Sequence, residues 1–210
     1  MVSLILASSS PRRQELLRRL GVPFTVTTAD LDESQQPGEA PLALVQRLAR
    51  AKARAVAERR PGHAVLGADT IVVLDDFVLG KPADTAEATA MLRSLRDRAH
   101  WVWSAVYAWN PQTGQEAAAL NGSQIWMRGY SDAEIAAYVD SGDPLDKAGA
   151  YAIQHRQFAP VARIVGCYSS VMGFPLNDIA RLLREIGVDV QGDVAAACAS
   201  PFGCCHDLSS

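Results

Sequence analysis

The sequence lacks a long hydrophobic run, because no apolar stretch in its 210 residues approaches the roughly 20 residues that a membrane span needs. It also lacks an excess of basic charge: 20 Lys and Arg face 23 Asp and Glu, for a net charge of −3. Proteins dedicated to nucleic acid are usually clearly basic. Cysteine is scarce, and Cys198, Cys204 and Cys205 lie near the C-terminal end, outside any expected core. We therefore expect a reduced, cytoplasmic protein with neither a membrane nor a nucleic acid as partner.

Two common nucleotide-binding motifs are absent as well. The chain has no G-x-x-x-x-G-K-[ST] loop and no G-x-G-x-x-G after a strand, which argues against kinase-like and dehydrogenase-like proteins. Hydrophobic residues make up 49% of the chain, enough for a sizeable core. We expect one domain with two lobes over residues 1–188, followed by a flexible tail over residues 189–210.

Strand and helix patterns alternate along the chain, which predicts an α/β fold. The expected strands cover residues 3–6, 24–28, 64–74, 77–82, 101–109, 116–127 and 161–165, with a further short strand near Tyr151. The expected helices cover residues 11–20, 41–59, 84–95, 131–139 and 176–186. Asp75-Asp76 is expected to form a tight turn between two of the strands.

The first strand-to-helix junction carries the sequence Ser8-Ser9-Ser10-Pro11-Arg12-Arg13. A helix N-terminus offers free backbone N–H groups and partial positive charge, serines add short donors, and arginine matches phosphate oxygens. Two arginines at this end oppose the helix dipole, which a phosphate site explains better than helix stability does. The alternative is a serine-capped helix with two solvated arginines.

A second group is Ala68-Asp69-Thr70 followed by Gly80-Lys81-Pro82. If residues 75 and 76 form a tight turn, residue 69 or 70 returns to lie beside Lys81. An ordinary surface ion pair is the alternative. However, a single Asp in an apolar strand is costly to bury without a partner or a task, and this favours function.

Acidic and basic residues elsewhere complete a candidate polyphosphate site. Glu33 lies in an acidic loop that could simply be solvated, and Lys52 lies on a helix face where it could extend along an apolar surface. Taken together, Arg12, Arg13, Lys52 and Lys81 can neutralise a polyphosphate. Glu33 and Asp69 can hold a divalent cation and orient or deprotonate a water. This set suits phosphoryl or nucleotidyl hydrolysis.

Five co-linear segments carry a resemblance to a known family: LASSSPRRQELLRRLGVPF, RLARAKA, LGADTIVVLDDFVLGKP, LDKAGAYAIQ and VGCYSSVMGFPL. From Leu4 to about Ile186 the chain resembles the Maf family of nucleoside triphosphate pyrophosphatases. The resemblance implies an elongated mixed central sheet with flanking helices and two lobes around a nucleotide cleft. It also implies hydrolysis of a nucleoside triphosphate to the monophosphate and pyrophosphate, a divalent cation such as Mg²⁺ or Mn²⁺, and a homodimer.

The resemblance further implies roles for single residues. Asp69 matches the proton acceptor, Lys81 and Lys52 match phosphate-facing lysines, Ser8 and Arg13 match an N-terminal phosphate loop, and Glu33 matches an acidic loop position. Arg12, Thr70 and Gln154 match the three discriminating positions of the branch that acts on dTTP and UTP. The 7-methyl-GTP branch has Trp, Gln and Glu there. Ser104 stands where the family typically has Thr, so the hydroxyl is kept.

The expected function is therefore hydrolysis of dTTP, UTP and modified pyrimidine nucleotides, a clearing activity linked to cell-division arrest. One alternative is a regulatory nucleotide-binding protein that inhibits septum formation. Another is a 7-methyl-GTP pyrophosphatase. The acid at Asp69 favours an enzyme, because a protein that only binds nucleotide needs no group to activate water.

Overall fold

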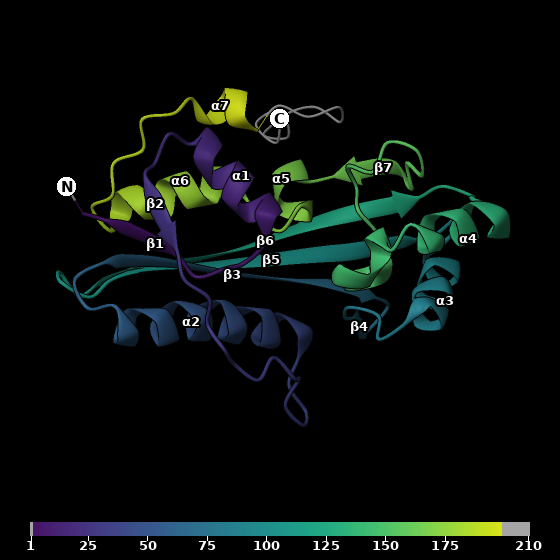
Figure 1. Cartoon of the computed structure of the whole chain (residues 1–210), viewed down its shortest axis with the longest axis horizontal. Coiled ribbons are helices and arrows are strands. Elements are labelled where there is room, and N and C mark those ends of the chain that lie inside the picture. Colours follow the sequence, from purple (N-terminus) through teal and green to yellow (C-terminus); the bar gives the residue numbers. More distant parts are fainter. Residues whose placement is uncertain (1, 199–210) are drawn as a thin grey trace.

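A seven-stranded sheet runs the length of the molecule in this computed structural model, which describes residues 2–198 (Figure 1). The strands are β1 (Leu4–Leu6), β2 (Phe24–Val26), β3 (Ala64–Leu74), β4 (Phe77–Leu79), β5 (Ala99–Asn110), β6 (Gln115–Met127) and β7 (Val161–Val165). Their order is β2-β1-β3-β5-β6-β7, and β4 pairs with β3 outside this path. β1 is parallel to β2 and β3, whereas the other pairings are antiparallel. The expected mixed α/β fold is confirmed.

Helices cover both faces of this sheet. They are α1 (Pro11–Arg19), α2 (Pro41–Arg59), α3 (Thr85–Leu95), α4 (Asp132–Asp140), α5 (Tyr168–Val171), α6 (Leu176–Glu185) and α7 (Val194–Ala197), with 3-10 turns η1 (Asp143–Asp146) and η2 (Ala148–Ala150). Local sequence explains several of their starts. Pro11 begins α1, and the Ser10 side chain accepts a hydrogen bond from the Arg13 amide. Ser131 and Glu134 form a capping box at the start of α4, as the sequence predicts.

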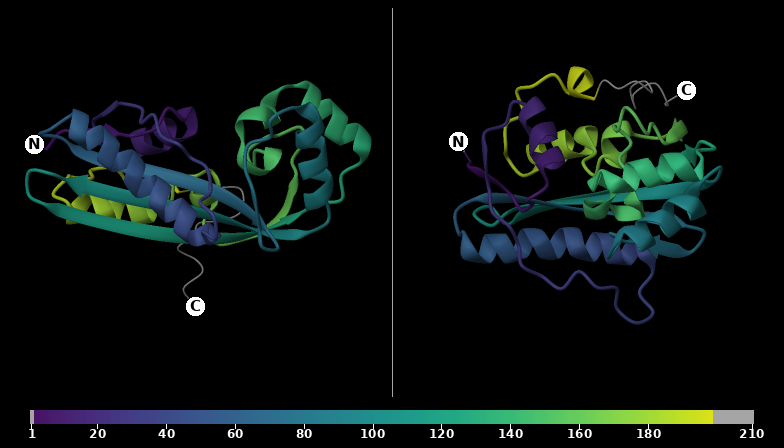
Figure 2. Two further views of the ribbon diagram at one scale, coloured as in Figure 1. Left: turned by 90° about the horizontal axis from the view of Figure 1, so that it is seen from below. Right: turned by 45° about the vertical axis from the view of Figure 1, so that its right-hand side comes forward.

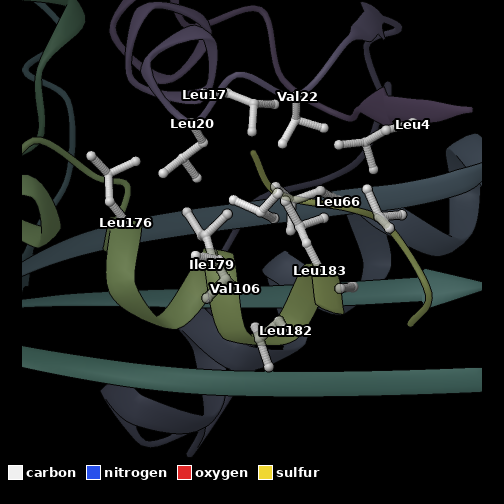
Figure 3. Close-up of a cluster of buried hydrophobic side chains, with 14 of the residues drawn as sticks. Leu4, Leu17, Leu20, Val22, Leu66, Val106, Leu176, Ile179, Leu182 and Leu183 are labelled. Atoms are coloured by element: carbon white, nitrogen blue, oxygen red, sulfur yellow. The ribbon is translucent and has the colours of Figure 1, made fainter. Parts of the chain in front are cut away.

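The core consists of three clusters of buried residues. Side chains alternate between the two faces of the sheet, so one cluster lies on one face and two lie at different ends of the other. On one face, α2 packs against Val65, Ile71 and Tyr107. On the other face, α1 and α6 pack over one end of the sheet, where leucines and isoleucines meet Leu66 and Val106 (Figure 3). α3 and α4 cover the far end of that face (Figure 2). The helices of this face therefore gather at two ends of one sheet.

Two expectations for the later part of the chain are wrong. The segment before Tyr151 forms η1 and η2 rather than leading into a short strand. Residues 189–198 are packed rather than a loose tail, because Val190, Ala197 and Cys198 are buried in the same cluster as side chains of α1 and α6. The Gly192 amide also donates to the Leu20 carbonyl at 2.9 Å. Residues 199–210, with Cys204 and Cys205, lie outside the described residues.

On one edge of β3, the middle of the strand has no described strand beside it. β1 pairs with its start, Ala64–Leu66, and β4 pairs with its end, Val72–Leu74. Between them, no described strand pairs with residues 67–71 on that edge, although β5 pairs along the whole opposite edge from Val65 to Val73. The sheet is therefore interrupted at the very residues that include Asp69 and Thr70. Within residues 2–198, no helix combines the length and the apolar character that crossing a bilayer requires.

Candidate active site

A cavity of about 560 Å³ opens at this interruption of the sheet. Its walls come from the start of α1, the loop before α2, the middle of α2 and β3, the residues after β4, the segment 146–154 and the residues after α5. All the site residues expected from the sequence line it: Ser8, Arg12, Arg13, Glu33, Lys52, Asp69, Thr70, Lys81 and Gln154. Segments far apart in the sequence therefore meet at one place.

A buried ion pair lies on the α2 side of the cavity. The Lys52 Nζ is 2.6 Å from Asp69 Oδ1 and 2.9 Å from Glu33 Oε1. The Lys52 and Asp69 side chains are 10% and 9% exposed, whereas that of Glu33 is 51% exposed. Gly67 allows this approach, because a Cβ there would lie 2.3 Å from the Ala49 carbonyl oxygen of α2. The two carboxylates thus contact the same ammonium group, that of Lys52, beside the cavity.

The expectation that residue 69 or 70 returns to lie beside Lys81 stays a prediction, because no described strand pairing reaches Lys81. The β3–β4 ladder ends at Val72 and Leu79, so Lys81 lies beyond the paired residues. Lys81 lines the same cavity and is exposed. No ion pair found within residues 2–198 involves it. The Lys81 ammonium group is available to an anion that enters the cavity, whereas the Lys52 ammonium group is already paired with Asp69.

The two adjacent arginines of α1 differ in their surroundings. Arg12 is half-buried at the cavity, and its Nη1 lies 3.8 Å from Asp146 Oδ2. Arg13 donates from Nε to the Gly173 carbonyl at 3.0 Å, from Nη1 to the Ala68 carbonyl at 2.8 Å and from Nη2 to Thr70 Oγ1 at 3.1 Å. Burial lowers the pKa of the Arg13 guanidinium from its ordinary value. Arg13 thus ties α1 to the segment of β3 that carries Asp69.

Thr70 lies on the other side of β3 from Asp69, because neighbouring side chains in a strand point to opposite faces. Its Oγ1 is 2.9 Å from the Oγ of Ser104, a fully buried residue of β5. Ser104 in turn donates to the Ser170 carbonyl at 2.8 Å. Asp69 and Thr70 both line the cavity because it passes around the free edge of β3.

The segment after α4 contributes one residue that the sequence reasoning missed, Lys147. Lys147 is buried at the cavity, and its Nζ lies 2.9 Å from Asp143 Oδ1 and 2.6 Å from Asp146 Oδ1. Gln154 follows on the same segment and is exposed. Lys147 belongs to the quoted segment LDKAGAYAIQ, and its flanking acids were a usable signal. Gly173 had no such signal, because its importance depends on long-range contacts, and Ser104 was noted only for its hydroxyl.

The charges of the cavity suit a polyanionic ligand beside an acid. Arg12, Lys52, Lys81 and Lys147 supply positive charge, and serines 8–10 precede the N-terminus of α1, which favours phosphate. Among the described residues, no group of three or more His, Cys, Asp or Glu could hold a metal ion unaided. Mg²⁺ often binds one or two carboxylates together with substrate phosphates. Glu33 and Asp69 fit that pattern.

The fold and the cavity define an α/β protein built to bind a phosphate-rich ligand against a buried carboxylate. The chain belongs to the Maf-like protein family, whose model matches residues 3–186. Among curated relatives, a dTTP/UTP pyrophosphatase of Symbiobacterium thermophilum is 48% identical over 190 residues, covering 90% of this chain and 97% of the relative. A dTTP/UTP pyrophosphatase of Moorella thermoacetica is 47% identical over 194 residues, covering 92% and 100%.

A likeness to a solved structure is more distant. The Ham1 protein of Staphylococcus aureus is 13% identical with a TM-score of 0.43, covering 60% of this chain and 71% of that protein.

Proposed function

We propose that this chain hydrolyses dTTP and UTP to the nucleoside monophosphate and pyrophosphate. One observation carries the proposal: Asp69, Lys52 and Glu33 are in contact in a cavity that also holds Arg12, Lys81 and Gln154. The substrates are supported by the relatives named dTTP/UTP pyrophosphatase, which are 42% to 48% identical over most of the chain. Modified pyrimidine nucleotides remain further predicted substrates.

In the proposed reaction, Asp69 accepts a proton from a water molecule as that water attacks the α-phosphorus. A bond forms between the water oxygen and the α-phosphorus, the bond to the bridging oxygen breaks, and pyrophosphate leaves. Lys52 orients the Asp69 carboxylate through their hydrogen bond of 2.6 Å. Lys81 and the start of α1, with Ser8, hold the phosphates. Most of the rate enhancement then comes from positioning and charge neutralisation.

We also propose that the enzyme uses Mg²⁺ or Mn²⁺. Asp69 and Glu33 would hold the cation, because both carboxylates already point at a single positive group, Lys52 Nζ. The cation, when bound with substrate, neutralises phosphate charge. Glu33 is the more exposed of the two acids, so it can turn from Lys52 without leaving a buried charge.

The decisive experiment is pyrophosphate release from dTTP, UTP, CTP and 7-methyl-GTP, with and without Mg²⁺ or Mn²⁺. Asp69→Asn serves as the inactive control. Metal-dependent release from dTTP and UTP supports the proposal. Preference for 7-methyl-GTP would keep the chemistry and overturn the assignment of Arg12, Thr70 and Gln154. Nucleotide binding without release would favour the regulatory alternative, and the link to cell-division arrest stays a prediction.

We propose further that the protein is a cytoplasmic homodimer joined through β6. Within residues 2–198, no strand pairs with the outer edge of residues 115–123, and Glu116 is their one charged residue. Open, weakly charged strand edges pair readily with a second chain. Light scattering should give twice the chain mass of 22.5 kDa, and Ala118→Lys should lower that mass. A monomer at micromolar concentration would overturn this proposal.

A further inference from the structure

The hydroxyl of Thr70 belongs to a chain of hydrogen bonds whose direction is fixed. Arg13 Nη2 donates to Thr70 Oγ1 at 3.1 Å, because a guanidinium has no acceptor. At the other end, Ser104 Oγ lies 2.8 Å from the Ser170 carbonyl oxygen, which can only accept. The single hydroxyl proton of Ser104 is therefore committed to Ser170.

The hydrogen bond between the Thr70 and Ser104 hydroxyls can then have only one direction. Thr70 Oγ1 and Ser104 Oγ are 2.9 Å apart, and Ser104 has no second proton to give. Thr70 consequently donates to Ser104. Its oxygen has two lone pairs, and Arg13 uses one of them. Toward the cavity, Thr70 can therefore only accept a hydrogen bond.

The space next to this oxygen is kept clear. Gly173 has a φ of +88°, and a Cβ at this position would lie 2.9 Å from Thr70 Oγ1 and 3.4 Å from Arg13 Nε. A side chain there would crowd the free lone pair, and the positive φ favours glycine independently. Ser104 itself is 0% exposed, so water cannot offer it another donor.

We propose that Ser104 is a specificity-determining positioning residue: it orients the Thr70 proton away from the cavity, so that Thr70 accepts from the N3–H of a uracil or thymine ring. The proposal rests on the proposed function, because it assumes a pyrimidine triphosphate in the cavity. The uracil edge presents an acceptor, a donor and an acceptor. Arg12 and the Gln154 amide can supply donors on either side of the Thr70 acceptor.

The same arrangement rejects cytosine. The N3 atom of cytosine is itself an acceptor, so two lone pairs would face each other at Thr70, and a buried group left without its partner is costly. Selection would therefore depend on the direction of a proton rather than on the size of the pocket. A threonine whose hydroxyl was free to rotate could serve either base.

The test compares kcat/KM for UTP and CTP in the unmodified enzyme and in Ser104→Ala, Ser104→Thr and Ser123→Ala. Ser123 is an equally buried serine, on β6, that bonds to Cys167 and does not line the cavity. We expect Ser104→Ala to lower the UTP-to-CTP ratio about tenfold, the equivalent of one net hydrogen bond. Ser104→Thr should restore the ratio, and Ser123→Ala should leave it unchanged.

N3-methyl-UTP gives a second readout that needs no variant. It lacks the N3–H donor, so the unmodified enzyme should hydrolyse it at least about tenfold less efficiently than UTP. Equal use of UTP and N3-methyl-UTP, or an unchanged ratio in a folded Ser104→Ala, would overturn the role of Ser104 and leave the proposed function intact. Failure of the unmodified enzyme to hydrolyse either UTP or dTTP would overturn both.

Discussion

The ion pair between Lys52 and Asp69 predicts an asymmetry between two substitutions. Lys52→Met removes the cation that two carboxylates share, and Asp69, whose side chain is 9% exposed, is left as a buried charge without a partner. Breaking a buried pair in this way costs about 3–5 kcal/mol. Asp69→Asn leaves Lys52 paired with Glu33 at 2.9 Å. Its cost should be about 1 kcal/mol, that of one net hydrogen bond.

The assay is thermal unfolding of both single variants and of the double variant. For a chain of this size, 1 kcal/mol corresponds to about 2–4 °C, so Lys52→Met should lower Tm by about 6–20 °C and Asp69→Asn by about 2–4 °C. The double variant should be more stable than Lys52→Met alone, because no buried carboxylate remains unpaired. Lys81→Met is the matched control and should change stability by less than about 0.5 kcal/mol.

Turnover should rank these variants differently from stability. Asp69→Asn should retain nucleotide binding and lose about 10²- to 10⁴-fold in kcat, as expected for loss of a general base. If Asp69→Asn unfolds as easily as Lys52→Met, or if the double variant is no more stable than Lys52→Met, the charge argument is refuted. A fully active Asp69→Asn would refute the catalytic role alone.

Three further predictions concern packing, pH and base selection. Gly67→Ala should lower both Tm and kcat, measured by unfolding and pyrophosphate release, because a Cβ 2.3 Å from the Ala49 carbonyl oxygen must displace α2 and with it Lys52. Burial lowers the pKa of His100 from 6.5 to about 4. The histidine of the unfolded chain binds a proton more tightly than His100 does in the folded protein. The free energy of unfolding should therefore fall as pH drops from about 6.5 to 4, by about 2 kcal/mol at pH 5. In His100→Gln, urea titrations should no longer show this contribution to the pH dependence. Gln154→Glu should shift kcat/KM away from dTTP and UTP across a nucleotide panel, since an ionised carboxylate offers no donor, and an unchanged panel would exclude Gln154 from base recognition.

Local signals made much of the fold predictable. The residue limits of α2 (Pro41–Arg59), β3 (Ala64–Leu74) and β7 (Val161–Val165) agree with those expected from the sequence. Proline at the start of α2 and a long apolar run in β3 mark these elements clearly. The segment before Tyr151 was harder, because Gly149 takes a non-helical φ of +69° and kinks the chain there, which a strand pattern does not reveal.

The site was predictable as a set of residues but not as a set of contacts. Every expected site residue lines one cavity. The ion-pair partner of Asp69 was nevertheless not predicted, because the turn directs attention to Lys81 whereas packing of α2 on β3 brings Lys52 Nζ to 2.6 Å from Asp69 Oδ1. The position of a helix on a sheet depends on close approaches such as that of α2 to Gly67. The periodicity of the sequence does not show which residues of the helix and the strand will meet. The contacts of Ser104 with Thr70 and Ser170 could not be foreseen for the same reason, although its hydroxyl was noted.

The alternation of side chains at Asp69 and Thr70 has a consequence for how such a protein can diversify. One peptide unit separates the group proposed to activate water from the group proposed to select the base, yet the strand directs them to opposite sides. Substitutions around Ser104 and Gly173 can alter ligand choice without touching Lys52 or Glu33. The pleat of a single strand thus allows new selectivities to evolve on an unchanged reaction.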